Sequence, residues 1–152
     1  MRSIADALQS IAVTLWVGGM WAIGFIVAPL LFARVPDRAL AGLIAGTLFT
    51  YVAFLGIACA AYLLVFRVAR FGAGSLKQGF FWVTALMLAL TLAGEFGVQP
   101  ILESLRAQAL PREVMESLLR DRFMTWHGVA SALYIVQSLL GLMLAVLHGR
   151  GK

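Results

Sequence analysis

The chain has 152 residues, of which 62% are hydrophobic and 12% are charged, and its mean hydropathy is +0.93. Soluble domains carry about 25% charged residues, so this composition argues against an ordinary water-soluble globule. The formal net charge is +5, but the Lys and Arg residues stand at the ends of apolar runs and form no basic stripe with aromatic residues. Nucleic acid is therefore not an expected partner.

Charge is absent from four long runs, which cover residues 7–33, 39–66, 78–94 and 123–149. A helix needs about 20 predominantly apolar residues to span the hydrocarbon core of a bilayer. We therefore predict an all-α polytopic membrane protein with one membrane domain over residues 1–152. Its four transmembrane helices are expected to form an antiparallel bundle in the lipid bilayer, at about residues 7–33, 39–66, 78–101 and 123–148.

The connection between the third and fourth helices, residues 103–122, differs from the two shorter ones. Its apolar residues recur at close to helical spacing, with Arg and Glu residues between them. This pattern predicts an amphipathic helix that either lies on the bilayer surface or extends the third or fourth helix. Pro111 is expected to divide it into two pieces.

The distribution of positive charge does not decide the orientation by itself, since six Lys and Arg residues fall on each side of the predicted bundle. The side opposite the termini carries five acidic residues against one, and its basic residues lie partly in the amphipathic segment. We therefore favour a multi-pass protein of the cell (inner) membrane with both termini in the cytoplasm.

Small residues mark the faces on which the helices are expected to pack. The second helix contains the G-x-x-x-G pair Gly42 and Gly46, and the fourth contains Gly128 and Ser131. Because lipid provides no hydrophobic drive between helices, small residues stabilise a bundle by letting backbones approach closely. The same glycine-rich faces also allow a homo-oligomer. No internal repeat is apparent, so an inverted-repeat transporter is not expected.

One acidic residue, Glu95, lies inside an apolar helix. Carboxylates in such positions usually face a bundle interior, an aqueous cavity or a partner, which points to a proton or cation site. Gln99 follows four residues later on the same helix face, and Pro100 frees a backbone carbonyl one turn back. The alternative is that Glu95 lies near the membrane interface, and the sequence leaves both interpretations open.

His127 is expected at the same membrane level as Glu95, so the two would form a pair if the third and fourth helices are neighbours. The alternative is an interfacial histidine beside an aromatic-belt tryptophan, Trp126. His127 and Glu95 are also the candidate metal ligands. The other histidine, His148, would lie ~32 Å further along the same helix, so one chain cannot supply two histidines to a haem. The sequence identifies no cofactor.

Catalytic motifs are missing from the chain, which has no nucleophile elbow, P-loop, His-Glu-x-x-His or dinucleotide-binding fingerprint. Ser131 lies four residues after His127 on one helix face, but no third group that would orient the pair is apparent. The sequence therefore favours a protein that is not an enzyme, and it leaves the question open.

Three blocks of the chain carry a family resemblance. The first is a tryptophan-rich helix from Trp16 onward that leads to Leu31, Phe32, Pro36, Leu48 and Phe49. The second is the third helix, with Pro100 at its end, and the third is the start of the fourth helix, with Phe123, His127, Gly128 and Ser131. In this order the blocks resemble the transmembrane protein 205-like family. The resemblance implies a four-helix membrane domain of unknown function, whose vertebrate relative is associated with platinum-drug resistance. It matches His127 and Gly128 and offers no counterpart of Glu95.

Three functions agree with these features. The first is the transport or handling of an ion, a metal species or a small solute, with a polar lining made by Glu95, Gln99, His127 and Arg34. The second is a membrane-embedded redox or haem-associated protein, and the third is a non-catalytic scaffold that uses the glycine-rich faces. The embedded Glu95 favours the first, because an ionisable residue inside the membrane is by default a functional-site candidate.

Overall fold

The computed structural model describes residues 4–109 and 118–150, which form helices joined by short connections. Four continuous helical stretches within these residues are long and apolar enough to cross a membrane: Ile4–Arg34, Arg38–Lys77, Gly79–Ala109 and Arg120–Arg150. The prediction of an all-helical chain with four membrane-spanning helices is confirmed. The elements in chain order are α1 (Ile4–Ala22), the π-helical turn η1 (Ile23–Val27), α2 (Ala28–Arg34), α3 (Arg38–Phe71), the 3-10 helix η2 (Gly72–Lys77), α4 (Gly79–Leu92), the π-helical turn η3 (Ala93–Val98), α5 (Gln99–Ala109) and α6 (Arg120–Arg150).

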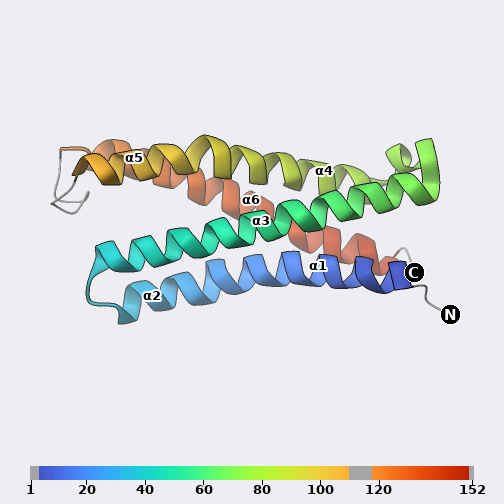
Figure 1. The fold of residues 1–152 in the computed structure, drawn as a ribbon, viewed down its shortest axis with the longest axis horizontal. Coiled ribbons are helices and arrows are strands. Elements are labelled where there is room, and N and C mark those ends of the chain that lie inside the picture. The colour runs from blue at the N-terminus through green and yellow to red at the C-terminus, as the bar shows by residue number, and fades with distance from the viewer. Residues whose placement is uncertain (1–3, 110–117, 151–152) are drawn as a thin grey trace.

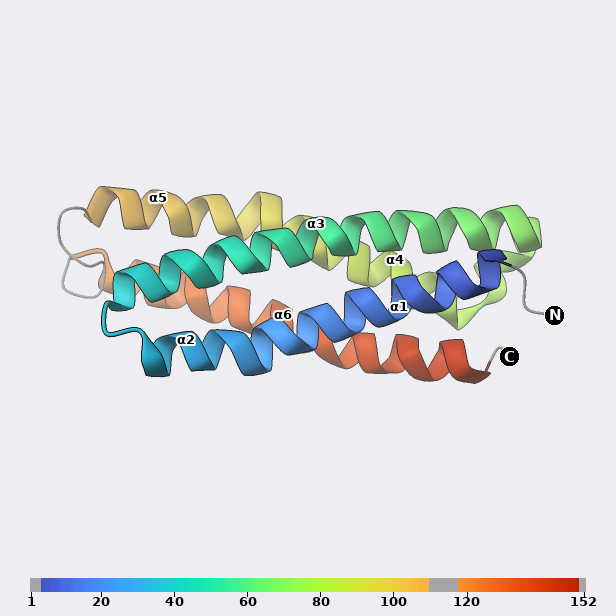
Figure 2. The same cartoon turned by 60° about the horizontal axis from the view of Figure 1, so that its bottom comes forward.

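The four spans pack as a ring, in which α1 contacts α3, α3 contacts α4, α4 contacts α6, and α6 contacts α1. Consecutive spans run in opposite directions, so both ends of the chain lie at the same end of the bundle (Figures 1 and 2). Large apolar side chains cover the outside, and four of the most exposed are Leu43, Tyr51, Val65 and Leu139. Water would disfavour such a surface and acyl chains accept it, so the chain is a multi-pass membrane protein.

The helix α3 extends beyond its uncharged run at both ends. Asp37 caps its start, since the carboxylate accepts a hydrogen bond from the backbone N–H of Leu40 at 3.0 Å. The helix continues past residue 66 to Phe71 and ends at Gly72, whose φ of 54° favours glycine. Charged residues such as Arg67 continue a helix where it leaves the hydrocarbon, so hydropathy alone made the predicted helices too short.

The helix α5 contains the first part of the predicted amphipathic segment. It runs to Ala109 and buries Leu102 and Leu105 in a cluster with Phe123 of α6. Residues 103–109 thus adopt the arrangement in which the segment extends the third span. Residues 110–117, with Pro111 and its predicted break, lie outside the described residues.

Two spans are interrupted by a π-helical turn shortly before a proline. The turn η1 ends two residues before Pro29, and η3 ends two residues before Pro100. A proline donates no N–H bond, and its ring clashes with the carbonyl four residues earlier, so a wider turn at this point relieves the clash. Such turns are frequent at functional sites.

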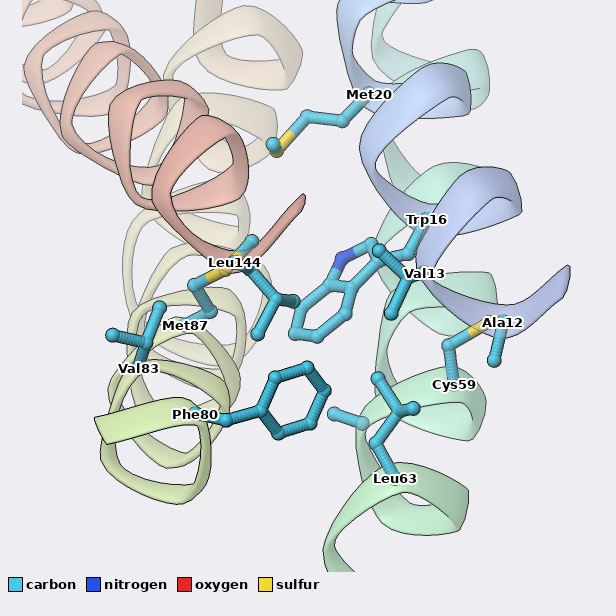
Figure 3. Packing of buried hydrophobic residues seen from close by; sticks show 11 residues of the cluster. Ala12, Val13, Trp16, Met20, Cys59, Leu63, Phe80, Val83, Met87 and Leu144 are labelled. Atoms are coloured by element: carbon cyan, nitrogen blue, oxygen red, sulfur yellow. The ribbon is translucent and has the colours of Figure 1, made fainter. Parts of the chain in front are cut away.

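The half of the bundle nearer the termini is closely packed. Trp16 is 1% exposed, and its indole reaches from α1 across the core towards Met87 of α4 and Leu144 of α6 (Figure 3). Phe80 packs in the same cluster. Gly56 of α3 provides the space for the indole, because a Cβ atom there would lie 2.3 Å from Trp16 Nε1. Side chains fill this half of the bundle.

A polar cluster lies beyond this core, towards the termini. The guanidinium of Arg67 donates to the Gln78 side-chain oxygen at 2.9 Å and lies 4.1 Å from the centre of the Phe80 ring. It also donates to the Gln9 side-chain oxygen at 3.0 and 3.1 Å when that amide is oriented to accept. The charge of Arg67 is therefore held by groups from α1 and from the start of α4.

The two helical hairpins of the bundle, α1–α3 and α4–α6, correspond to each other. The buried residues of α1 and α4 have the same spacing: Gln9, Ala12, Val13, Trp16 and Met20 against Phe80, Val83, Thr84, Met87 and Thr91. The same register aligns Phe25-x-Val27-x-Pro29 with Phe96-x-Val98-x-Pro100 and superposes the two π-helical turns. Buried residues of the other two helices also match: Gly56, Ala60 and Leu63 against Gln137, Gly141 and Leu144.

The ring of helices therefore has an approximate internal two-fold relation, with one π-helical turn in each half. The relation is parallel, since α1 and α4 run in the same direction (Figure 1). It preserves buried positions more than residue identities, which is why it is not apparent in the sequence alone.

Candidate functional site

A cavity of about 420 Å³ lies between the packed core and the α2–α3 turn, and all four spans line it. Trp16 and Met20 mark its end at the core, and Phe32 and Arg106 mark the opposite end. Along α6 it extends from His127 to Gln137, which is about 15 Å at 1.5 Å per residue. Its volume falls in the range of about 300–1,000 Å³ that is typical of small-molecule sites.

Polar side chains interrupt an otherwise apolar lining at several depths. They come from the third span and from α6, whereas the first span and α3 contribute mainly apolar residues and glycines. The polar lining residues are Thr91, Glu95, Gln99, Arg106, His127, Ser131, Tyr134 and Gln137. An apolar cavity with a few convergent polar groups is the usual form of a ligand site.

The end of the cavity farther from the core is cationic. The guanidinium of Arg106 crosses from α5 to α3, where its Nη1 lies 3.3 Å from the position of a Cβ atom on Gly46. The Gln99 Nε2 atom lies 3.5 Å from the same position. Phe123 supports this end, since its ring lies 5.4 Å from the Arg106 guanidinium and stacks on His127 with centroids 5.8 Å apart. Gly46 thus creates the space in which two side-chain donors meet.

The end of the cavity at the core is closed by hydrogen bonds between spans. The Gln137 amide donates to Thr91 Oγ1, and it lies 3.5 Å from the carbonyl oxygen of Met87. The Tyr134 hydroxyl donates to the carbonyl oxygen of Met20, three residues before the π-helical turn in the first span. These bonds tie α6 to the first and third spans, so they fix the floor of the cavity.

Glu95 lies in the π-helical turn η3, near the middle of the 31-residue third span, and it lines the cavity. This position agrees with the interpretation in which an embedded carboxylate faces a bundle interior. His127 also lines the cavity, near the start of α6. Within the described part of the chain, no hydrogen bond joins Glu95 to His127. Thr91 pairs with Gln137 and Arg106 lies over Phe123, so Glu95 lies nearer the core than His127 in the same cavity.

The structure leaves one residue of the predicted polar lining outside it and adds five others, which are Thr91, Arg106, Ser131, Tyr134 and Gln137. Glu95, Gln99 and His127 face a common cavity, whereas Arg34 lies exposed at the end of α2 and is not part of the lining. Arg106 occupies the cationic end instead. In the sequence Arg106 looked like one of several charges of an amphipathic segment. The signal that could have identified it is its seven-residue spacing from Gln99, which places both on one helix face.

The residues predicted to pack helices together do not share one role in the structure. Gly42, Gly46 and Ser131 line the cavity, and nothing lies within 4 Å of a Cβ atom built on Gly128. The close helix contacts are made at Gly24, Gly56 and Gly141. At Gly24, for example, a Cβ atom would lie 2.3 Å from the Tyr134 ring.

Among residues 4–109 and 118–150, no three His, Cys, Asp or Glu side chains gather in an arrangement that could hold a metal ion. His127 lines the cavity, while His148 lies at the other end of α6 and hydrogen-bonds to Ser10 at 3.0 Å. One chain therefore brings the two histidines to opposite ends of the bundle.

Comparison with known proteins identifies a family whose description names no activity. No curated protein and no solved structure matches the chain. A model described as a domain of unknown function, DUF4149, matches residues 11–111, which include Glu95, Gln99 and Arg106. The resemblance to the transmembrane protein 205-like family stays a prediction. Since the match covers most of the chain, the protein belongs to the DUF4149 family of membrane proteins with a domain of unknown function.

Proposed function

We propose that this membrane protein binds a small polar solute in its central cavity and carries it across the bilayer. One observation supports the proposal: the π-helical turns of the first and third spans both line the cavity, with Gly24 and Phe25 from η1 and Glu95 and Val98 from η3. Transporters commonly place their binding sites where interrupted helices of two related halves meet near the middle of the membrane.

The unequal packing of the two halves of the bundle also supports transport. The cavity occupies the half towards the α2–α3 turn, and the core around Trp16 and Phe80 fills the half towards the termini. A solute that passes from one side to the other requires this core to open. The π-helical turns are the natural hinges for such a movement, because their hydrogen bonding is already irregular.

A solute fits the lining better than a bare metal ion does. A divalent metal requires several ligands that converge on one point, and the polar groups of this cavity are distributed along its length. The volume of 420 Å³ also exceeds what an ion needs. We therefore favour the small-solute form of the hypothesis.

We further infer that the protein lies in the inner membrane with both termini in the cytoplasm. The cavity would then lie towards the outer face of that membrane. The motif that carries the resemblance to the transmembrane protein 205-like family contains two lining residues, His127 and Ser131. This supports a role of that motif in solute binding.

The proposal is tested by asking whether the cavity is accessible from both sides of the membrane. Cys59, the single cysteine, is first replaced by alanine, and Ser131→Cys is then introduced on the lining. A sulfonate-bearing thiol reagent that does not cross membranes is applied to intact cells and to inverted membrane vesicles. We expect Ser131→Cys to react from both sides, because a carrier exposes its site alternately.

A matched control uses Leu139→Cys in the same background. Leu139 lies on the same helix, is 61% exposed and is not part of the lining, so it faces lipid and should not react from either side. Reaction of Ser131→Cys from one side only, or from neither, would contradict passage through this cavity.

A further inference from the structure

The cavity holds one acidic and one permanently basic side chain at different depths, and this arrangement constrains what it binds. We propose, building on the proposed function, that the solute is a zwitterion whose anionic group binds Arg106 and Gln99, whose cationic group binds Glu95, and whose apolar body lies against the aromatic wall. The experiment below separates this inference from the proposed function.

The anionic group is assigned to the end of the cavity at Gly46. The Arg106 Nη1 and Gln99 Nε2 atoms lie within 3.3 and 3.5 Å of one point on that wall. A guanidinium only donates hydrogen bonds, and a side-chain amide nitrogen does the same. Two donors, one of them charged, match the two oxygens of a carboxylate. Glu103 interacts with the Arg106 charge from one turn away, and it is exposed and lies outside the lining.

The cationic group is assigned to the level of Glu95, one helical turn closer to the core. Gln99 follows Glu95 by four positions, so the two groups stand about 6 Å apart along the helix. Glu95 lies near the middle of its span, where an ionised carboxylate requires a counter-charge. In the described chain no basic side chain forms an ion pair with it.

Aromatic rings surround the same level. Gly24 corresponds in register to Glu95, and its backbone lies against the Tyr134 ring. The Tyr134 ring lies 5.0 Å from Phe49 and 6.4 Å from Phe25, centre to centre, and all three rings line the cavity. Aromatic faces attract ammonium groups and accept apolar chains, so they suit both a cationic group and the aliphatic body that carries it.

Charge balance separates a zwitterion from a simple ion. In formal charges, counted with histidine neutral, the lining carries one negative residue, Glu95, and one positive residue, Arg106. A solute with one net charge would leave either Glu95 or Arg106 without a counter-charge within the cavity, where the dielectric is low, and this is strongly unfavourable. A solute that carries both charges pairs both residues.

The test compares three six-carbon probes that differ only in their charged ends: ε-aminocaproate, caproate and n-hexylammonium. Binding to the full-length protein in lipid nanodiscs is measured by isothermal titration calorimetry. We expect ε-aminocaproate to bind roughly 30-fold more tightly than either singly charged probe, because each of those leaves a cavity charge unpaired.

Two substitutions should change the preference in opposite directions. With Glu95→Gln, caproate should bind more tightly than it binds to the wild type and at least as tightly as ε-aminocaproate. With Arg106→Gln, n-hexylammonium should show the same gain. These are gains of binding for one probe, so loss of folding cannot produce them. The control is Glu103→Gln, an exposed acid on the same helix as Arg106, which should leave the ranking of the probes unchanged.

The inference fails if wild-type protein binds caproate or n-hexylammonium as tightly as ε-aminocaproate, if none of the three probes binds, or if neither substitution changes the ranking. If the probes fail in one of these ways but Ser131→Cys reacts from both sides of the membrane, the zwitterion inference is wrong and the carrier proposal stands. If the probes rank as expected but Ser131→Cys reacts from one side only, the binding site stands and transport through the cavity is contradicted.

Discussion

Three glycines carry the closest approaches between helices in this bundle. At Gly56 the missing side chain makes room for the Trp16 indole, at Gly24 for the Tyr134 ring, and at Gly141 for Met20. The G-x-x-x-G pair of α3 has another role, since Gly42 and Gly46 face the cavity. Small residues in a membrane helix thus serve both packing and the creation of space, and their spacing alone does not distinguish the two.

Substitution of Gly56 by alanine should destabilise the fold. The new methyl group would lie 2.3 Å from Trp16 Nε1, and the indole is too deeply buried to move aside. We expect the free energy of unfolding in detergent to fall by about 1–3 kcal/mol, as for other overpacked cores. Chemical unfolding followed by tryptophan fluorescence measures it.

Gly42→Ala is the matched control on the same helix. The nearest atom to a Cβ at Gly42 is 4.0 Å away, which is an ordinary contact. An equal loss of stability in both variants would show that the effect comes from the helix backbone and not from the Trp16 contact.

At the scale of the elements, hydropathy predicted the existence of each helix correctly and its ends poorly. The third span continues through Glu103 and Arg106 to Ala109, because a helix does not stop where its residues become polar. The π-helical turns were not predicted, although Pro29 and Pro100 indicated where they would occur. Proline signals a disturbed helix, and the neighbouring helices decide whether it becomes a kink, a break or a wide turn.

Replacing Pro100 by alanine should stiffen the third span. Alanine restores the missing N–H donor and removes the ring that favours the wide turn at η3. We expect a higher unfolding temperature in detergent and, in the Ser131→Cys background, reaction from the side of the termini that is slower by about tenfold or more.

Pro36→Ala is the control for this prediction. Pro36 lies in the exposed α2–α3 turn, outside any helix, so its replacement should change neither the unfolding temperature nor the labelling rate appreciably. Unchanged labelling in Pro100→Ala would mean that η3 is not a hinge.

On the scale of the whole molecule, the two hairpins form one ring whose two ends are packed unequally. Their buried positions match in spacing, yet one end of the bundle is filled by Trp16, Phe80 and Leu144 and the other end holds the cavity. The parallel two-fold relation exchanges the hairpins and leaves each end of the bundle in place, so the two ends are free to differ, and the size of the residues at each end decides whether it is filled.

The orientation of the molecule gives a prediction at this scale. Four antiparallel spans place both termini on one side, and we propose the cytoplasm. A reporter that fluoresces only in the cytoplasm, fused after Lys152, should be active, and one that is active only outside the inner membrane should not be. The second reporter should be active when it is inserted after Pro36, within the α2–α3 turn. The reverse pattern would invert the proposed direction of the cavity.

The sequence by itself determined that the chain is a membrane protein, that it has four spans, and that Glu95 is an unusual charge within one of them. These are properties of consecutive residues, and the bilayer acts on each span separately. Only the tertiary structure decided that Arg106 and not Arg34 completes the polar lining, and that Glu95 and His127 face one cavity without direct contact. Those relations depend on how each helix is rotated about its axis. The rotation is set by the π-helical turns and by contacts with other spans, such as that of Gly56 with Trp16. Such contacts join residues far apart in the chain, so no single run of residues contains them.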